Sequence, residues 1–363
     1  MAGNVVTAAS AEQRAAWFDG AMPQVERVRP GLWSIPVPIP INPLRYVLVY
    51  ALEIPDGVAI IDAGWNTDEA YAALVAGLGT AGYEIGDVKS VLVTHMHPDH
   101  YGLAGRVREG SGAWIGLHEA DARLLHDRYD EDAMVSLIDL QRRQLVKCGV
   151  PGLTADELAQ ASKSVRDFVT MVMPDRLIED GERLELPGWD LRALWTPGHT
   201  PGHLCFVEPE RKLLFSGDHV LAKITPHVAA HPQSGPNPLA DYLGSLREIG
   251  GLDVDEVLPA HEFRFLDLAA RIDYVIAHHE ERLAEIERAV AESPGLTCWD
   301  IATRLSWSRP WETIPLYMRR TANNETLAHL VWLEARGLLT RVPGEPGDPD
   351  LWFPPAPPTP PSP

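Results

Sequence analysis

The feature that most constrains this chain is the segment THMHPDH, which directly follows a strand expected over Val88–Thr94. It places three histidines and one aspartate within six residues, namely His95, His97, Asp99 and His100. Imidazole nitrogens and carboxylate oxygens are ligands that zinc and iron accept in proteins. A loop that begins at a strand end can aim several side chains at one point. Four ligands this close together cannot easily all reach one ion with good geometry, so the motif indicates two metal ions.

Three more ligand-type residues lie downstream, each after an apolar run that predicts a strand. His199 lies in the turn-rich loop TPGHTPGH, Asp218 ends the sequence FSGD, and His261 ends the sequence VLPAH. We expect these residues to complete the metal site. Strands followed by a helix occur twice along the chain, which favours an α/β fold of the αββα type with two similar halves.

Together these residues resemble the metallo-β-lactamase fold superfamily. Its five motifs occur here in order, as Asp62 in IDAGW, the HMHPDH loop, His199, Asp218 and His261. The resemblance covers roughly residues 25–290 and implies a four-layer αββα sandwich that holds two divalent metal ions. The ions expected are Zn²⁺, with iron or manganese as alternatives.

The resemblance also implies a role for each of these side chains. The implied ligands are His95, His97 and His199 for the first ion, Asp99, His100 and His261 for the second, and Asp218 as the bridge. Asp62 would lie behind the ligands and orient the metal loop through hydrogen bonds. We assign a similar supporting role to His203, which shares a loop with His199.

Such a site favours hydrolysis. Two divalent ions lower the pKa of a shared water, and they polarise the oxygen of a carbonyl or phosphoryl group. Asp99 would be the catalytic residue that takes the proton of the bridging hydroxide and passes it to the leaving group. We therefore expect a dinuclear hydrolase whose metal-bridging hydroxide attacks a small ester, thioester or lactone.

The pattern of apolar and turn residues divides the chain into parts. We expect a loosely held lead-in over residues 1–24 and a hydrolase domain over 25–292. Within it, residues 119–173 carry apolar residues at helical spacing, which predicts a helical insertion that caps the metal site. Residues 293–342 read as a small winged-helix domain, and 343–363 as a disordered tail with ten prolines in 21 residues.

The C-terminal domain carries a second resemblance. Ala328–Gly337 resembles the winged-helix module of one branch of the superfamily, which includes an endoribonuclease similar to β-lactamases and bacterial relatives. This branch makes a metal-dependent endoribonuclease or phosphodiesterase the alternative function. The helix expected over 324–336 has no basic face, because Glu325 and Glu334 stand beside Arg336. We therefore interpret the module as a packing or homodimerisation element, with nucleic-acid binding less favoured.

Several residues are candidates for the wall of a substrate pocket. His219, which follows the expected bridge, and His227 and His231, which lie in the proline-rich loop 224–238, are one group. The insertion offers a second group that could meet an anionic part of the substrate or simply form a solvated helix face, and its members are Arg142, Arg143 and Lys147.

Composition limits the partners and the location. Lys and Arg total 31 against 51 Asp and Glu, which gives a formal charge of −20. This charge disfavours a general polyanion binder, but not a small anionic substrate that reaches only the metals. The three cysteines lack CxxC spacing and suit a reducing compartment. No signal peptide or membrane-spanning stretch is visible, so we expect a cytoplasmic protein without membrane contact.

Overall fold

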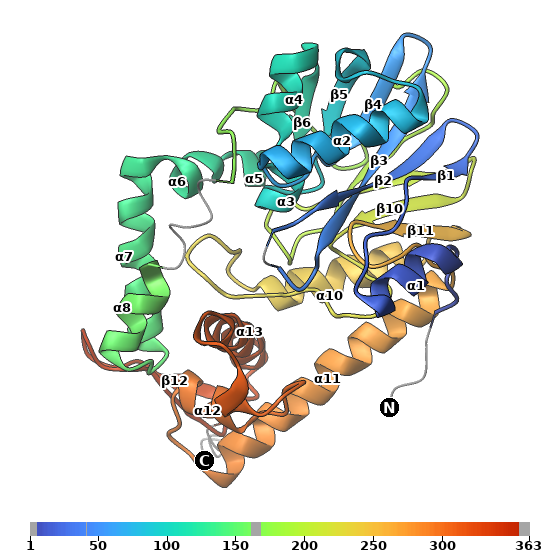
Figure 1. Cartoon of the computed structure of the whole chain (residues 1–363). Helices are drawn as coiled ribbons and strands as arrows, with labels where there is room; N and C mark the ends of the chain where they lie inside the picture. The colour runs from blue at the N-terminus through green and yellow to red at the C-terminus, as the bar shows by residue number, and fades with distance from the viewer. Residues whose placement is uncertain (1–5, 41, 161–167, 356–363) are drawn as a thin grey trace.

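The computed structural model describes residues 6–40, 42–160 and 168–355, and its centre is a pair of stacked β-sheets (Figure 1). In the larger sheet the strands follow chain order, with antiparallel pairing from β1 to β4 and parallel pairing from β4 to β7. Its strands are β1 (Glu26–Arg29), β2 (Leu32–Pro38), β3 (Tyr46–Ile54), β4 (Gly57–Ile61), β5 (Val88–Leu92), β6 (Trp114–Leu117) and β7 (Arg176–Leu177).

The smaller sheet has the strand order β11-β10-β9-β8. Strands β10 and β11 pair parallel, whereas β8, β9 and β10 pair antiparallel. The bounds are β8 (Arg192–Trp195), β9 (Leu204–Glu208), β10 (Leu213–Gly217) and β11 (Glu256–Pro259).

The sequence of strand β3 explains why this strand lies in the middle of the molecule. Successive side chains of a strand point to opposite faces. Val47 and Val49 belong to the apolar cluster under helix α2 (Asp68–Ala81), whereas Leu48 and Tyr50 belong to the cluster between the sheets. The ring of Tyr50 there meets the ring of Phe215 edge-on, with centroids 5.4 Å apart. Both faces of β3 are buried, which explains its nearly continuous apolar sequence.

Helices cover the outer face of each sheet. Helix α2 packs on the larger sheet, while α10 (Pro238–Ile249) and α11 (Leu268–Glu292) share an apolar cluster with β10 and β11. The four layers confirm the predicted α/β sandwich. Within the described ranges, no helix is both long enough and apolar enough to cross a membrane. Shorter connecting elements are η1 (Ile85–Asp87), α3 (Pro98–Tyr101), α4 (Ala104–Ser111) and η2 (Trp311–Thr313).

The insertion predicted over residues 119–173 contains a run of helices. They lie along one side of the molecule and lead from the sandwich toward the C-terminal helices (Figure 1). Their bounds are α5 (Glu119–Ala122), α6 (Leu125–Tyr129), α7 (Glu131–Lys147) and α8 (Gly152–Gln160). Residues 161–167 of the predicted insertion lie outside the described ranges.

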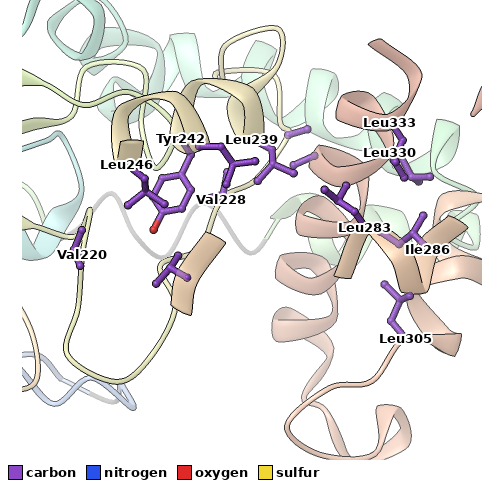
Figure 2. Close-up of a cluster of buried hydrophobic side chains, with 14 of the residues drawn as sticks. Val220, Val228, Leu239, Tyr242, Leu246, Leu283, Ile286, Leu305, Leu330 and Leu333 are labelled. Atoms are coloured by element: carbon purple, nitrogen blue, oxygen red, sulfur yellow. The ribbon is translucent and has the colours of Figure 1, made fainter. Parts of the chain in front are cut away.

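The C-terminal region consists of α12 (Cys298–Arg304), α13 (Leu316–Ala335), β12 (Thr340–Val342) and β13 (Leu351–Phe353). Its apolar side chains share one buried cluster with the sandwich. Figure 2 shows part of this cluster, with Leu330 and Leu333 of α13 near Leu283 and Ile286 of α11. The insertion also contacts this region, because the backbone N–H of Trp299 donates to the carbonyl oxygen of Cys148 at 2.8 Å.

The prediction of a loosely held lead-in over residues 1–24 is wrong for residues 11–19, because they form helix α1 (Ala11–Asp19). Ser10 caps the helix, and the buried side chain of Gln13 donates to Ser34 Oγ at 3.1 Å. The same side chain accepts a hydrogen bond from the backbone N–H of Arg264. A polar residue provides this anchor, so the apolar pattern did not reveal it.

The predicted disorder of 343–363 is wrong for the part that the structure describes. Strand β13 pairs antiparallel with β12, and the Trp352 side chain is only 1% exposed. The backbone N–H of Asp350 also donates to the carbonyl oxygen of Lys147 at 2.8 Å. Burial of this one large apolar side chain therefore holds the segment in the fold despite the surrounding prolines. Residues 356–363 lie outside the described ranges.

Replacing Trp352 tests whether this segment is part of the folded core. Loss of a buried aromatic side chain costs about 3–5 kcal/mol, so Trp352→Ala should lower the free energy of unfolding by that amount in urea titrations. The control is Leu338→Ala, at a site that is 39% exposed, and it should have little effect. Equal stability of the two variants would contradict the packing described here.

Candidate metal centre

The predicted ligands follow strand ends that meet at one edge of the sandwich. Parallel strands β4 and β5 end just before Asp62 and the His95 loop, and parallel strands β10 and β11 end just before Asp218 and His261. His199 follows β8. The structure thus brings the predicted ligands into three overlapping groups, which are His95, His97 and His199, then His95, His100 and Asp218, then Asp99, His100 and His261.

The first group is a cluster of three imidazoles. Nδ1 of His97 lies 3.0 Å from Nε2 of His95 and 3.1 Å from Nε2 of His199. His95 and His97 are two residues apart in the segment before α3, whereas His199 comes from a loop about a hundred residues later. Three ring nitrogens thus face one small volume.

The group of Asp99, His100 and His261, called the second group from here on, combines two imidazoles with a carboxylate from helix α3. Nε2 of His261 lies 3.3 Å from Oδ2 of Asp99, and Nε2 of His100 lies 3.6 Å from the same oxygen. Both rings are fully buried.

Asp218 lies between the two groups. Its Oδ1 is 3.2 Å from His261 Nε2 and 3.6 Å from His100 Nε2, and its Oδ2 is 3.6 Å from His199 Nε2. Each carboxylate oxygen therefore faces a different group. A carboxylate placed in this way has the geometry expected of a bridge between two ions.

The buried polar atoms at this site fit metal ions. Nε2 of His100, Nε2 of His261 and Oδ1 of Asp218 are all buried without a hydrogen-bond partner among the described residues. A buried polar atom without a partner is costly. Binding to a divalent cation would satisfy all three atoms.

Hydrogen bonds on the far side of the rings turn the Nε2 atoms of His199, His261 and His100 inward. Nδ1 of His199 donates to the carbonyl oxygen of His227, and Nδ1 of His261 donates to that of Tyr46, both at 2.8 Å. A carbonyl oxygen can only accept, so each Nδ1 carries a proton, and Nε2 is the nitrogen of each ring that can bind a cation. Nδ1 of His100 is held at 2.8 Å by Oδ2 of Asp62.

The carboxylates make the site attractive to positive charge. Burial lowers the pKa of His261, but Asp218 and Asp99 outweigh this effect and raise it to about 10. In the all-imidazole group, burial and the neighbouring rings lower the pKa of His95 and His97, which keeps them neutral. The all-imidazole group therefore offers nitrogen lone pairs to a cation, and the group with Asp99 offers negative charge.

Asp62 and His203, both predicted to lie behind the ligands, make hydrogen bonds to the segments that carry them. Oδ1 of Asp62 accepts from the backbone N–H of Thr94 at 2.8 Å, immediately before His95. Nε2 of His203 accepts from the backbone N–H of Asp218 at 3.1 Å, and its Nδ1 lies 2.8 Å from Thr196 Oγ1.

Asp121 was missed from the sequence. This fully buried carboxylate of α5 accepts hydrogen bonds from the backbone N–H groups of Met96 and Gly202 and from Thr200 Oγ1, at 2.7–2.9 Å. Burial raises its pKa to about 6. It thereby joins the THMHPDH loop to the loop of His199. An acidic residue in the first turn of a helix is common, so no local signal distinguished it.

A cavity of about 210 Å³ opens beside His97 and His199. Its wall includes Arg128 and Tyr129 of α6, residues of α7, the loop 227–232 and residues of α13. His227 and His231 line it, as the sequence predicted. The insertion and the C-terminal region therefore both contribute to the wall.

His219 was predicted to belong to the wall of a substrate pocket, but it does not line this cavity. Its ring is fully buried, with both nitrogens unpartnered among the described residues, and it packs edge-on against Tyr242 with centroids 4.9 Å apart. Burial lowers its pKa to about 3, so it stays neutral.

None of the three cationic residues considered on the insertion lines the cavity, and the two arginines agree with the alternative of a solvated helix face. Arg142 and Arg143 are exposed and pair with Asp156 and Asp139, and Lys147 donates to the carbonyl oxygen of Gly344. Residues spaced by three or four share one face of a helix. On α7 that face carries Met134, Leu137, Gln141 and Gln144 into the cavity wall, so the arginines beside Gln141 point elsewhere.

Comparison with known proteins places these residues in a wider context. Residues 42–261 match the model of the Metallo-beta-lactamase superfamily. The probable metallo-hydrolase YqjP of Bacillus subtilis (strain 168) is 27% identical over 322 residues, which cover 85% of this chain and 93% of that protein. Hydroxyacylglutathione hydrolase GloC of Haemophilus influenzae is 32% identical over 134 residues, which cover 36% of this chain and 50% of GloC.

Two solved structures resemble nearly the whole chain. The metallo-beta-lactamase family protein TTHA1429 from Thermus thermophilus has a TM-score of 0.77 and 32% identity, covering 90% of this chain and 100% of that one. A beta-lactamase domain protein from Burkholderia ambifaria has a TM-score of 0.76 and 25% identity, covering 93% and 97%.

A substitution at Gly217, the residue before Asp218, tests the packing behind the site. Its φ is +49°, and a Cβ atom there would lie 2.7 Å from His203 Nε2 and 2.9 Å from Thr94 Cβ. Gly217→Ala should therefore lower the free energy of unfolding by about 1–3 kcal/mol. The matched control is Gly79→Ala in α2, where a Cβ meets nothing within 4 Å, and helix propensity should stabilise that variant by up to about 1 kcal/mol. An equal change in the free energy of unfolding in both variants would contradict the close approach of His203 and Thr94 to Gly217.

Proposed function

Since the chain belongs to the metallo-β-lactamase superfamily and is a metal-dependent hydrolase, we propose that it uses two metal ions to hydrolyse a small ester, thioester or lactone. The observation that carries the proposal is Asp218, whose two carboxylate oxygens face different groups of ligand side chains. This arrangement matches a dinuclear centre better than a single ion.

The proposed ligands follow the groups in the structure. His95, His97 and His199 would hold one ion, Asp99, His100 and His261 the other, and Asp218 both. We propose Zn²⁺ as the ion, because nitrogen and carboxylate ligands suit it, with iron or manganese as alternatives. Ions bound there supply a nucleophile at neutral pH by lowering the pKa of water, and they polarise the acyl oxygen of the substrate.

The residues around the ions have separate tasks. Asp99, whose carboxylate lies at the centre of the second group, would take the proton of the attacking water and return it to the leaving group. Asp62, His203 and Asp121 fix the ligand loops, so that the site needs little reorganisation during the reaction.

The form of the cavity supports a small substrate. Walls from α6, α7 and α13 surround the space beside His97 and His199, whereas a polymer would need an open groove. Helix α13 contributes Arg320, Thr321 and Asn324 to this wall. We propose that the C-terminal region shapes the pocket, in preference to the alternative in which it presents RNA to the site.

A substrate panel separates these possibilities. Metal-analysed protein is assayed with thioesters, carboxyl esters, lactones, phosphodiesters and single-stranded RNA. The partial match to a hydroxyacylglutathione hydrolase supports the inclusion of glutathione thioesters. Hydrolysis of acyl substrates without RNA cleavage is expected. RNA cleavage without acyl hydrolysis would establish the endoribonuclease alternative instead.

Metal analysis tests the assignment of ligands. Plasma mass spectrometry of the purified chain should find two ions. His97→Ala and His261→Ala should each retain one, because each variant damages one group of ligands. His126→Ala, at an exposed site, should retain both. A full complement of ions in the His97 and His261 variants would contradict the assignment.

Asp99→Asn tests the proton-transfer role. Loss of a general acid–base group lowers rates by about 10²–10⁴-fold, so kcat for the best panel substrate should fall by that factor, while KM changes little. Asp127→Asn, on the exposed surface, is the control. An Asp99→Asn variant with wild-type kcat would disprove the role.

A further inference from the structure

Two arginines from distant parts of the chain face the same cavity. Arg128 lies near the end of α6 in the insertion, and Arg320 lies in the second turn of α13. Both belong to the wall that also contains the candidate metal ligands His97 and His199. The packing of the insertion against the C-terminal region thus places two guanidinium groups on one small hollow.

The described part of this wall carries no acidic side chain. The described residues that line the cavity include no aspartate or glutamate, although the chain contains 51 of them and has a net charge of −20. Among the described residues, the wall therefore carries positive charge inside a strongly acidic protein. Such a wall is suited to an anion.

The hydrogen bonds of Arg128 leave part of its guanidinium for a ligand. Its Nη1 donates to Oε1 of Gln233, a neutral acceptor, at 3.2 Å. Its Nε is buried and has no hydrogen-bond partner among the described residues. Arg320 is held from behind, where its Nη1 donates to the carbonyl oxygen of Leu158 at 2.8 Å. These bonds orient both guanidinium groups, and the acceptor on Gln233 carries no charge that would neutralise Arg128.

The pKa values of His231 and Arg320 agree with two positive charges close together. Burial lowers the pKa of His231, and Arg128, His227 and Arg320 lower it further, to about 3. Burial and the charge of Arg128 also lower the pKa of Arg320. The two arginines therefore act on the same volume, and their mutual repulsion would be relieved by a bound anion.

The apolar residues of the same wall indicate what the rest of the ligand would look like. Met134, Leu137 and Leu145 of α7 form an apolar surface in the same cavity. A matching molecule would have a reactive group at His97 and His199, a short apolar body on α7, and an anionic end.

We propose that Arg128 and Arg320 form an anion subsite, and that the enzyme selects small acyl substrates which carry a carboxylate or phosphate remote from the scissile bond. This inference rests on the proposed hydrolase function. It also transfers to these two residues the anion-binding role that the sequence suggested for Arg142, Arg143 and Lys147. The guanidinium group suits both carboxylate and phosphate, because it can donate two parallel hydrogen bonds.

Matched substrates test the proposal and distinguish the two anions. One arm compares succinyl, glutaryl and adipyl thioesters of N-acetylcysteamine with uncharged acyl thioesters of the same carbon number. The other arm compares acetyl-pantetheine with acetyl-4′-phosphopantetheine. In at least one arm, the wild-type enzyme should prefer the anionic member by about tenfold or more in kcat/KM, as expected for charge-assisted hydrogen bonds.

Variants assign the preference to the two arginines. Arg128→Gln and Arg320→Gln should each reduce it by about tenfold, whereas Arg142→Gln on the exposed face of α7 should preserve it. Calorimetric binding of glutarate and pentanoate to the metal-loaded wild-type chain gives a second readout that needs no substitution. Glutarate should bind about tenfold more tightly.

The outcomes separate this inference from the proposed function. Hydrolysis of the charged and uncharged thioesters at equal rates, together with equal binding of glutarate and pentanoate, would overturn the subsite and leave the hydrolase proposal standing. A preference that survives in both arginine variants would also overturn it. Failure to hydrolyse any acyl substrate would instead reject the proposed function, while the glutarate measurement would still decide whether the arginines bind an anion.

Discussion

Hydrogen bonds on the far side of the imidazole rings determine where the nitrogens of the candidate metal centre point. Asp62 holds His100, the carbonyl oxygen of His227 holds His199, and that of Tyr46 holds His261. These acceptors come from the end of β4, the loop after β10 and the start of β3. The site therefore depends on the correct stacking of two sheets, and the buried sandwich acts as the support that keeps lone pairs facing inward.

Much of the fold and of the ligand set could be predicted from the sequence. Ligand-type residues stand directly after apolar runs, and the ends of parallel strands such as β4 and β5 meet at one sheet edge. The resemblance to a superfamily added the assignment of each ligand, and the structure brings the named side chains within reach of one another. Order along the chain and strand-end position, together with the resemblance, thus named the side chains that meet in these groups.

Features that depend on long-range packing could not be predicted. Asp121 looks like an ordinary residue in a first helical turn, and its role comes from three donors in two other loops. The arginines of the cavity wall were missed for a similar reason. The sequence of the insertion offered Arg142 either as an anion contact or as part of a solvated helix face, and the structure exposes it. Arg128 and Arg320 line the same cavity only after α6 and α13 pack around it. Trp352 likewise anchors a proline-rich segment by burial alone.

The central claim is that Asp218 lies between two metal ions. Anomalous diffraction from crystals of the zinc-loaded chain, recorded above and below the zinc absorption edge, tests it most directly. Two anomalous peaks per chain are expected, one among His95, His97 and His199 and one among Asp99, His100 and His261, with a carboxylate oxygen of Asp218 toward each. A single peak, or peaks away from Asp218, would contradict it.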